Sequence, residues 1–197
     1  PKGVGGRIAD ALASGSQKFT TNSFSLKGKQ TWSEGFNIIQ QALDGRGEIR
    51  TLENYTGRRP LIDNLTKEGL GNIYAEEYSK NLGKMVDNAE VLAGQLANVT
   101  LSTTWPEELD NSLARQFQAV SKLIASSGTR EVEREFFFVE LGGFDTHNDF
   151  ETLDELFTQI DDSLDAFVKE LKAQGVFDSV VLVTSSDFGR TLTSNGK

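Results

Sequence analysis

The sequence contains no cysteine and only one histidine. Without cysteine the chain can form no disulfide, no thiolate nucleophile and no cysteine-based metal or iron–sulfur site. It also lacks any apolar run near the ~20 residues needed to cross a bilayer. Positive charge is scarce, with 20 basic against 29 acidic residues and a net charge of −9. The missing apolar run predicts that the chain has no transmembrane segment. Because an acidic surface repels phosphate backbones, we also expect no nucleic-acid partner, whereas a metal cation would suit the negative charge.

The 197 residues, 37% hydrophobic and 25% charged, amount to about one globular domain. The hydrophobic spacing of residues 1–130 predicts a mostly helical and loop portion. That spacing predicts helices over 8–12, 33–43 and from 104 to about 126, and one or two helices over 68–97, where Gly83 and Gly94 weaken the pattern. Residues 13–29 should be loop or extended chain, in which Phe19, Phe24 and Leu26 would contact the core. Residues 50–65 should be irregular, because Arg59-Pro60 favours an extended bend.

Residues 131–197 have a different pattern. A short run rich in Phe and Val predicts a buried strand over 135–141. Residues 149–174 form the clearest amphipathic helix, with Asn148 as its N-cap and Gly175 at its end. A second apolar run predicts a strand over 179–184. Strand, helix and strand make a βαβ unit, so we predict an α/β fold with a parallel sheet and a helical segment before this unit.

Chemistry-bearing side chains follow both predicted strands. Asp145 and His147 come after the first strand, and Asp187 and Arg190 after the second. In open parallel sheets ligands bind beyond the carboxyl ends of the strands, so these four residues should share one crevice. Two carboxylates and an imidazole suit Zn²⁺, Mn²⁺, Mg²⁺ or Ca²⁺. The guanidinium of Arg190 offers a planar set of donors for phosphate or sulfate oxygens.

Each of these residues also has an ordinary structural explanation. Asp145 would cap the turn after Gly142-Gly143, and a lone histidine before a helix is commonly a structural hydrogen-bonding group. Asp187 would cap a turn, and Arg190 would pair with it at the surface. Only the shared position at strand ends favours the functional interpretation.

The two loops resemble the DUF1501 family. The resemblance rests mainly on Gly142-Gly143-Phe144-Asp145-Thr146-His147 and on Thr184-Ser185-Ser186-Asp187-Phe188-Gly189-Arg190-Thr191. Weaker matches are the Gly-rich start at residues 3–12, the Trp-x-x-Gly stretch at 32–35 and the helix over 113–124.

That family is similar to the alkaline phosphatase and sulfatase superfamily of metal-dependent ester hydrolases. The resemblance implies an incomplete alkaline-phosphatase-like domain, with Asp145, His147 and Asp187 as metal ligands and a phosphate or sulfate ester as substrate. It also implies an exported protein, secreted, extracellular or periplasmic. Residues 1–197 would be the central part of the domain, and the nucleophile would lie outside them.

The sequence departs from the pattern of related hydrolases. Asp187 stands where the family more usually has Glu, and Phe188 replaces the histidine of an Asp-His-Gly motif, so one ligand is missing. Two hypotheses follow. The chain is part of an exported metal-dependent hydrolase, with Arg190 near the transferred group. Alternatively, it is a non-catalytic extracellular or surface-assembly protein that retains the fold, and an oligomer or assembly is compatible with either.

Overall fold

The computed structural model describes residues 2–15, 18, 20–43, 55–66, 71–147, 151–189 and 193 and has a mixed α/β architecture. Its sheet has three parallel strands in the order β2-β1-β3, formed by Gln41–Ala42, Thr20–Ser25 and Val132–Phe138. Ser25 lies opposite both Ala42 and Phe138. The carboxyl ends of all three strands therefore lie along one edge of the sheet.

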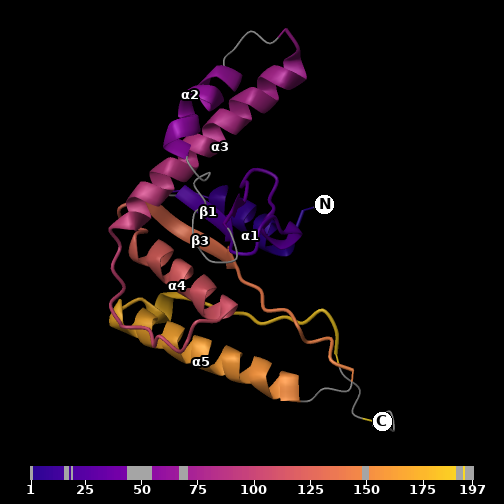
Figure 1. Ribbon diagram of the computed structural model, residues 1–197, viewed down its shortest axis with the longest axis vertical. Coiled ribbons are helices and arrows are strands. Elements are labelled where there is room, and N and C mark those ends of the chain that lie inside the picture. Colours follow the sequence, from indigo (N-terminus) through magenta and orange to yellow (C-terminus); the bar gives the residue numbers. More distant parts are fainter. Residues whose placement is uncertain are drawn as a thin grey trace.

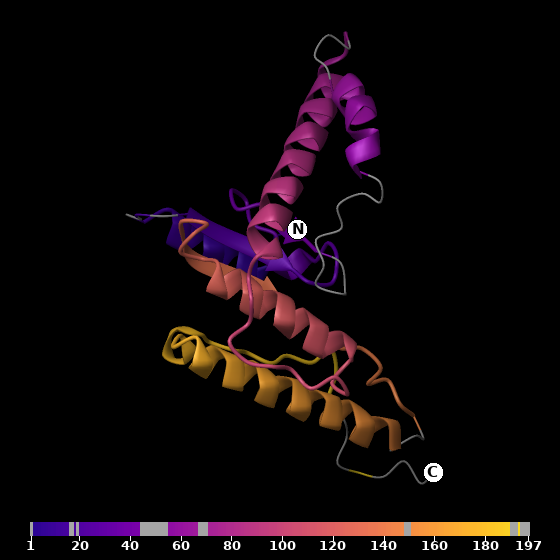
Figure 2. The same ribbon diagram turned by 60° about the vertical axis from the view of Figure 1, so that its left-hand side comes forward.

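Five α-helices and two 3-10 helices are described. They are α1 (Val4–Ala13), α2 (Tyr55–Leu65), α3 (Ile73–Ala97), α4 (Ser112–Ala125), α5 (Glu151–Ala173), η1 (Thr31–Ser33) and η2 (Phe177–Ser179). Figures 1 and 2 show α2 and α3 projecting away from the sheet, with α4 and then α5 on the opposite side. None of the helices in these described ranges combines the length and apolar character needed to cross a bilayer.

The core lies between the sheet and α4, and continues to α5. The rings of Phe24 and Phe137 stack 5.8 Å apart on neighbouring strands, and Phe117 of α4 stacks 4.6 Å from Phe167 of α5. Phe138 instead contacts Trp32 of η1, with ring centroids 5.9 Å apart. Because successive strand residues point to opposite faces, α4 and η1 cover opposite faces of the sheet.

Several elements confirm the sequence-based predictions. The short helix at the N-terminus is α1, the region 68–97 gives the single helix α3, and the long amphipathic segment gives α5. The strand predicted over 135–141 forms three residues earlier as β3. Gly175 ends α5 with a φ of 73°, as expected of a helix C-terminal stop. Phe24 and Leu26 are fully buried, whereas Phe19 and the N-cap predicted at Asn148 lie outside the described residues.

The helix predicted over 33–43 is wrong. After η1 the chain forms a loop that ends in β2. The carboxylate of Asp10 accepts hydrogen bonds from the backbone N–H groups of Phe36, Asn37 and Ile38. The bond from Ile38 contributes most to lowering the pKa of Asp10, which burial partly opposes. These bonds use the N–H groups that a helix would need, and so they fix the loop.

Residues 55–65, predicted to be irregular, form α2 with Pro60 inside it. The guanidinium of Arg59 lies 2.8 Å from Asp63 and 2.7 and 2.8 Å from Asp87 and Glu90 of α3. Ile62 packs against α3 in the same contact. Tertiary pairing with α3 therefore outweighs the local preference of the Arg-Pro pair.

Two further findings concern residues 1–130. The loop or extended chain predicted after α1 contains strand β1, and residues 1–130 carry two of the three described strands. The helix predicted from Thr104 begins only at Ser112, where Asn111 accepts a hydrogen bond from the N–H of Ala114 at 2.9 Å. The preceding loop is instead bound by Glu170 of α5 through the N–H groups of Ser102 and Thr103.

The second strand of the predicted βαβ unit is not formed. Within the described part of the chain, residues 180–184 are extended but pair with no strand, and Val181 and Val183 are 88% and 83% exposed. In both views the chain after η2 runs back along α5 (Figures 1 and 2). Val180 packs against the core cluster that α4 and α5 share with the sheet, but residues 180–184 form no described backbone pairing with β3.

The start of α1 packs so closely on η1 and the following turn that only glycine fits. A Cβ atom on Gly6 would lie 2.1 Å from the carbonyl carbon of Glu34, whereas one on Gly94 of α3 would meet nothing within 4 Å. Both positions are helical, so alanine improves helix propensity at each. We expect Gly6→Ala to destabilise the fold by about 1–3 kcal/mol through overpacking.

Gly94→Ala is the matched control and should stabilise the fold by about 0.5–1 kcal/mol. Urea denaturation of both variants measures the difference. Equal shifts of the two midpoints in the same direction would contradict the close packing of α1.

Candidate functional site

The loop after β3 brings together two of the predicted ligands. The Nε2 atom of His147 lies 3.3 Å from Oδ1 of Asp145, and the two side chains are 84% and 80% exposed. This distance is longer than the ~2.7–2.9 Å of a charge-assisted hydrogen bond between nitrogen and carboxylate. Both groups therefore face solvent beyond the carboxyl end of the sheet with donor atoms available to a ligand.

The base of this loop is fixed by contacts with two helices. The side-chain amide of Gln116 in α4 donates to the carbonyl of Glu140 at 2.9 Å and accepts from its N–H at 3.0 Å. The ring of Phe144 meets Phe157 of α5 edge-on, with centroids 5.9 Å apart. Gly143, with a φ of 99°, supplies the turn between these two anchors. The exposed pair thus sits at the tip of a loop with an ordered base.

The structure does not add Asp187 to this pair. In the described ranges no group of three His, Cys, Asp or Glu side chains is placed to hold a metal ion. Asp187 is exposed in the chain after η2, where the hydroxyl of Ser186 donates to the carbonyl of Phe188 at 2.7 Å. Arg190 lies outside the described residues. The chain after β3 and the chain after η2 nevertheless run toward the same end of the molecule (Figures 1 and 2).

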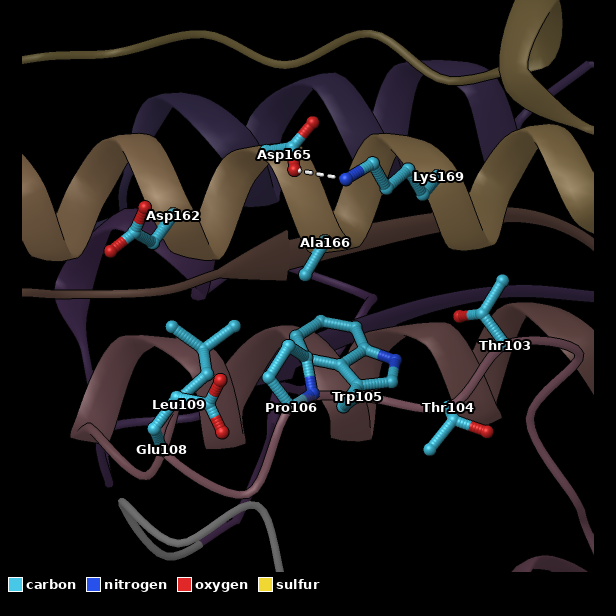
Figure 3. Close-up of a pocket in the computed structure, with 10 residues that line it drawn as sticks. All are labelled: Thr103, Thr104, Trp105, Pro106, Glu108, Leu109, Asp162, Asp165, Ala166 and Lys169. Carbon is cyan, nitrogen blue, oxygen red and sulfur yellow. Dashed lines mark ion pairs between the residues drawn. The ribbon is translucent and has the colours of Figure 1, made fainter.

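A separate hollow of about 320 Å³ lies between α5 and the loop that precedes α4. Figure 3 shows Trp105, Pro106 and Leu109 of the loop facing Ala166 of α5. On the helix side, Lys169 pairs with Asp165 at 2.6 Å. No residue of the Asp145–His147 loop lines this hollow, so it is not part of the predicted site.

Two important buried polar residues were missed by the sequence analysis. Gln116 and Glu170 are both fully buried. The sequence held a signal for both residues, because each is a polar side chain within the apolar face of an amphipathic helix. Gln116 precedes Phe117 in α4, and Glu170 precedes Leu171 in α5. A polar side chain at such a position indicates a buried hydrogen-bonding partner.

Comparison with known families gives one match. The sequence model of the family described as "Protein of unknown function (DUF1501)" matches residues 72–197, which include both loops. The chain has no match among curated proteins or among solved structures.

Proposed function

The chain belongs to the DUF1501 family, and from that premise we propose that it contributes to an exported, metal-dependent hydrolase-like domain that acts on phosphate or sulfate esters. The Asp145–His147 pair is the observation that carries this proposal. Asp187 would be the third ligand and Arg190 the cation near the transferred group, as the resemblance to phosphatases and sulfatases implies.

The geometry of the pair suits a metal ion. Two ligand atoms at ~2.0–2.1 Å from a tetrahedral Zn²⁺ lie about 3.3–3.4 Å apart, and Nε2 of His147 and Oδ1 of Asp145 are separated by 3.3 Å. Both side chains are exposed, so neither must leave a buried partner to bind. An ion bound there would activate water and neutralise ester oxygens, while this chain would hold the ion and orient it above the sheet.

The alkaline-phosphatase-like fold is likewise a proposal. The apolar end of β3, Phe136 to Phe138, is only half-buried at the edge of the sheet, and Val181 and Val183 are exposed after η2. Parallel strands with continuous apolar runs are normally covered on both faces. These features support a larger sheet in the complete domain, with residues 180–184 as a further strand and the chain as its central part.

A non-catalytic role in an extracellular or surface assembly is the second candidate. It is favoured by Phe188, which occupies the place of a ligand in related hydrolases, and by the absence of a three-residue ligand cluster from the described residues. Such a protein would keep the fold and the exposed pair but would not turn over an ester.

Metal binding tests the proposal directly. Isothermal titration of the 197-residue chain with Zn²⁺ and Mn²⁺ should show one site. Asp145→Ala and His147→Ala should each weaken binding at least tenfold, because each removes one of the few ligands. Both residues are exposed, so the free energy of unfolding should change by less than about 0.5 kcal/mol.

Asp161→Ala is the matched control, since Asp161 is an exposed acid of α5 outside the pair. The absence of binding by either metal, or equal binding by all three variants, would overturn the metal site. Because the nucleophile would lie outside these 197 residues, hydrolysis of aryl phosphate and aryl sulfate by the metal-loaded complete domain then separates the two candidates. A complete domain that binds metal without turnover would support the non-catalytic role.

A further inference from the structure

A buried amide underlies the loop of the proposed metal site. Gln116 is fully buried in α4, and every polar atom of its side chain is used. Its Nε2 donates to the carbonyls of Ser112 at 3.0 Å and Glu140 at 2.9 Å, and its Oε1 accepts from the N–H of Glu140 at 3.0 Å. The backbone donor of Glu140 thereby fixes which end of the amide is oxygen.

These bonds replace a missing strand. Glu140 lies two residues beyond the end of β3, where a neighbouring strand would normally satisfy its N–H and C=O groups. The side-chain amide of Gln116 carries the same donor and acceptor as a peptide group and pairs with both. Gln116 of α4 therefore keeps the chain after β3 ordered as far as Glu140, five residues before Asp145.

We propose that Gln116 is the positioning residue of the Asp145–His147 loop, and this inference rests on the proposed function of that loop. The loop leaves the hydrogen bonds at Glu140, turns at Gly143 and contacts α5 through Phe144 and Phe157. Without the bonds from Gln116, the chain would keep the packing of Val139 and Leu141 on the core and the contact of Phe144 on α5, but the backbone N–H and C=O of Glu140 would lose these partners. The pair at the tip would then sample many separations, and metal affinity would fall.

Gln116→Met tests the inference, because methionine has the same length and fills the same space but cannot pair with Glu140. The Kd for Zn²⁺, measured by titration of the full chain, should rise about tenfold or more, as is typical when a group that orients a metal ligand is lost. Hydrogen exchange at residues 140–147 should accelerate at least tenfold, while exchange in the middle of α5 stays unchanged.

Ser121→Ala is the matched control. Ser121 is also a fully buried polar residue of α4, and its hydroxyl has no hydrogen-bond partner among the described residues. Its removal should leave both the Kd for Zn²⁺ and the exchange rates as in the wild type. If Gln116→Met does not fold, Gln116→Leu gives the same test, because leucine is also uncharged and cannot pair with Glu140.

The outcomes are distinct. Wild-type Kd and wild-type exchange in a folded Gln116→Met variant would overturn the inference and leave Gln116 as a packing residue. Faster exchange without a change in Kd would also overturn it, since the loop would be ordered by Gln116 but the site would not depend on it. If the wild-type chain binds no Zn²⁺, the proposed function fails, and exchange at residues 140–147 alone decides whether Gln116 orders the loop.

Discussion

Replacing Arg130 by alanine should lower the free energy of unfolding by about 3–5 kcal/mol, because it leaves a buried carboxylate without its partner. The side chains of Arg130 and Glu135 are only 4% and 7% exposed, and the guanidinium lies 2.8 Å from the carboxylate. It also donates to the hydroxyl of Ser126 at 2.9 Å and to the carbonyl of Leu123. The same group lies 5.7 Å from the ring centre of Phe24, so it joins α4 to both β1 and β3.

The cost of Arg130→Ala should depend on pH. Burial raises the pKa of Glu135 above its usual value of 4.5, and Arg130 partly opposes this rise. A carboxyl group with a higher pKa in the folded chain than in the unfolded chain contributes its full stability at a pH below the unfolded-chain value. This contribution is lost as the pH rises through the pKa of the folded chain. Without Arg130 the pKa rises further, so the deficit of the variant should be largest at pH 7 and shrink as the pH falls toward 4.5.

Urea denaturation between pH 4.5 and 7 measures this effect, with Arg134→Ala as control. Arg134 pairs with Glu133 at 3.3 Å near the surface of the same strand, and its loss should cost less than about 1 kcal/mol. A cost for Arg130→Ala as small as that of the control would show that the buried pair does not stabilise β3.

The amphipathic helices could be predicted because their stability comes from apolar faces that the sequence displays. Helices α1, α3 and α5 were placed correctly in this way, although single ends moved. The errors occur where one distant polar side chain decides the backbone. Asp10 fixes the loop after η1, and Arg59 stabilises α2 despite Pro60. Contacts between side chains and partners that lie 28 positions apart in the sequence leave no local pattern in it.

Two errors about strands have a different cause. An apolar run indicates burial but does not identify the partner, so the run at 180–183 predicts a strand although it pairs with no described strand. Strand β1 was missed because its sequence, Thr20–Ser25, is mostly small and polar. Its side chains are nevertheless buried, since α1 and η1 pack closely against this part of the sheet.

The candidate site could be predicted only in part. Asp145 and His147 lie near one another, as is expected of two residues that belong to one loop. The approach of Asp187 depends on the pairing of two strands, and that pairing is not formed in the described residues. The buried groups that order the site, such as Gln116, were recognisable only once the helix faces were known.

Glu170→Ala is the second change with a large expected effect, about 2–4 kcal/mol of lost stability. The buried carboxylate of Glu170 accepts hydrogen bonds from the N–H groups of Ser102 and Thr103 at 2.8 and 2.7 Å, from the hydroxyl of Thr103 and from the amide of Gln174 at 2.8 Å. Alanine would leave these partly buried donors without this acceptor, and an unsatisfied donor costs up to about 1–3 kcal/mol when it is fully buried. The loop before α4 would then lose its main attachment to α5.

The pH dependence of this variant should differ from that of Arg130→Ala. Burial is the largest single influence on the pKa of Glu170 and raises it, but the bonds from Thr103, Gln174 and Ser102 together outweigh burial and lower the pKa. Because the pKa of Glu170 is lowered in the folded chain, its carboxylate contributes its full stability at a pH above the usual value of 4.5. This contribution is lost as the pH falls through the pKa of the folded chain. The deficit of Glu170→Ala should therefore be constant from pH 7 to about 4.5 and shrink only below it.

Urea denaturation from pH 3 to 7 tests this, with Lys169→Ala as the neighbouring control. Lys169 forms only an exposed pair with Asp165, so its loss should cost less than about 1 kcal/mol at any pH. A deficit for Glu170→Ala that already shrinks between pH 7 and 5 would contradict the lowered pKa.

Because Asn111, at the end of the same loop, caps α4 and accepts a hydrogen bond from the hydroxyl of Ser163 of α5 at 3.3 Å, loosening this loop should also disturb the helix that carries Gln116. The stability of this region and the order of the Asp145–His147 loop are thus expected to fall together in Glu170→Ala.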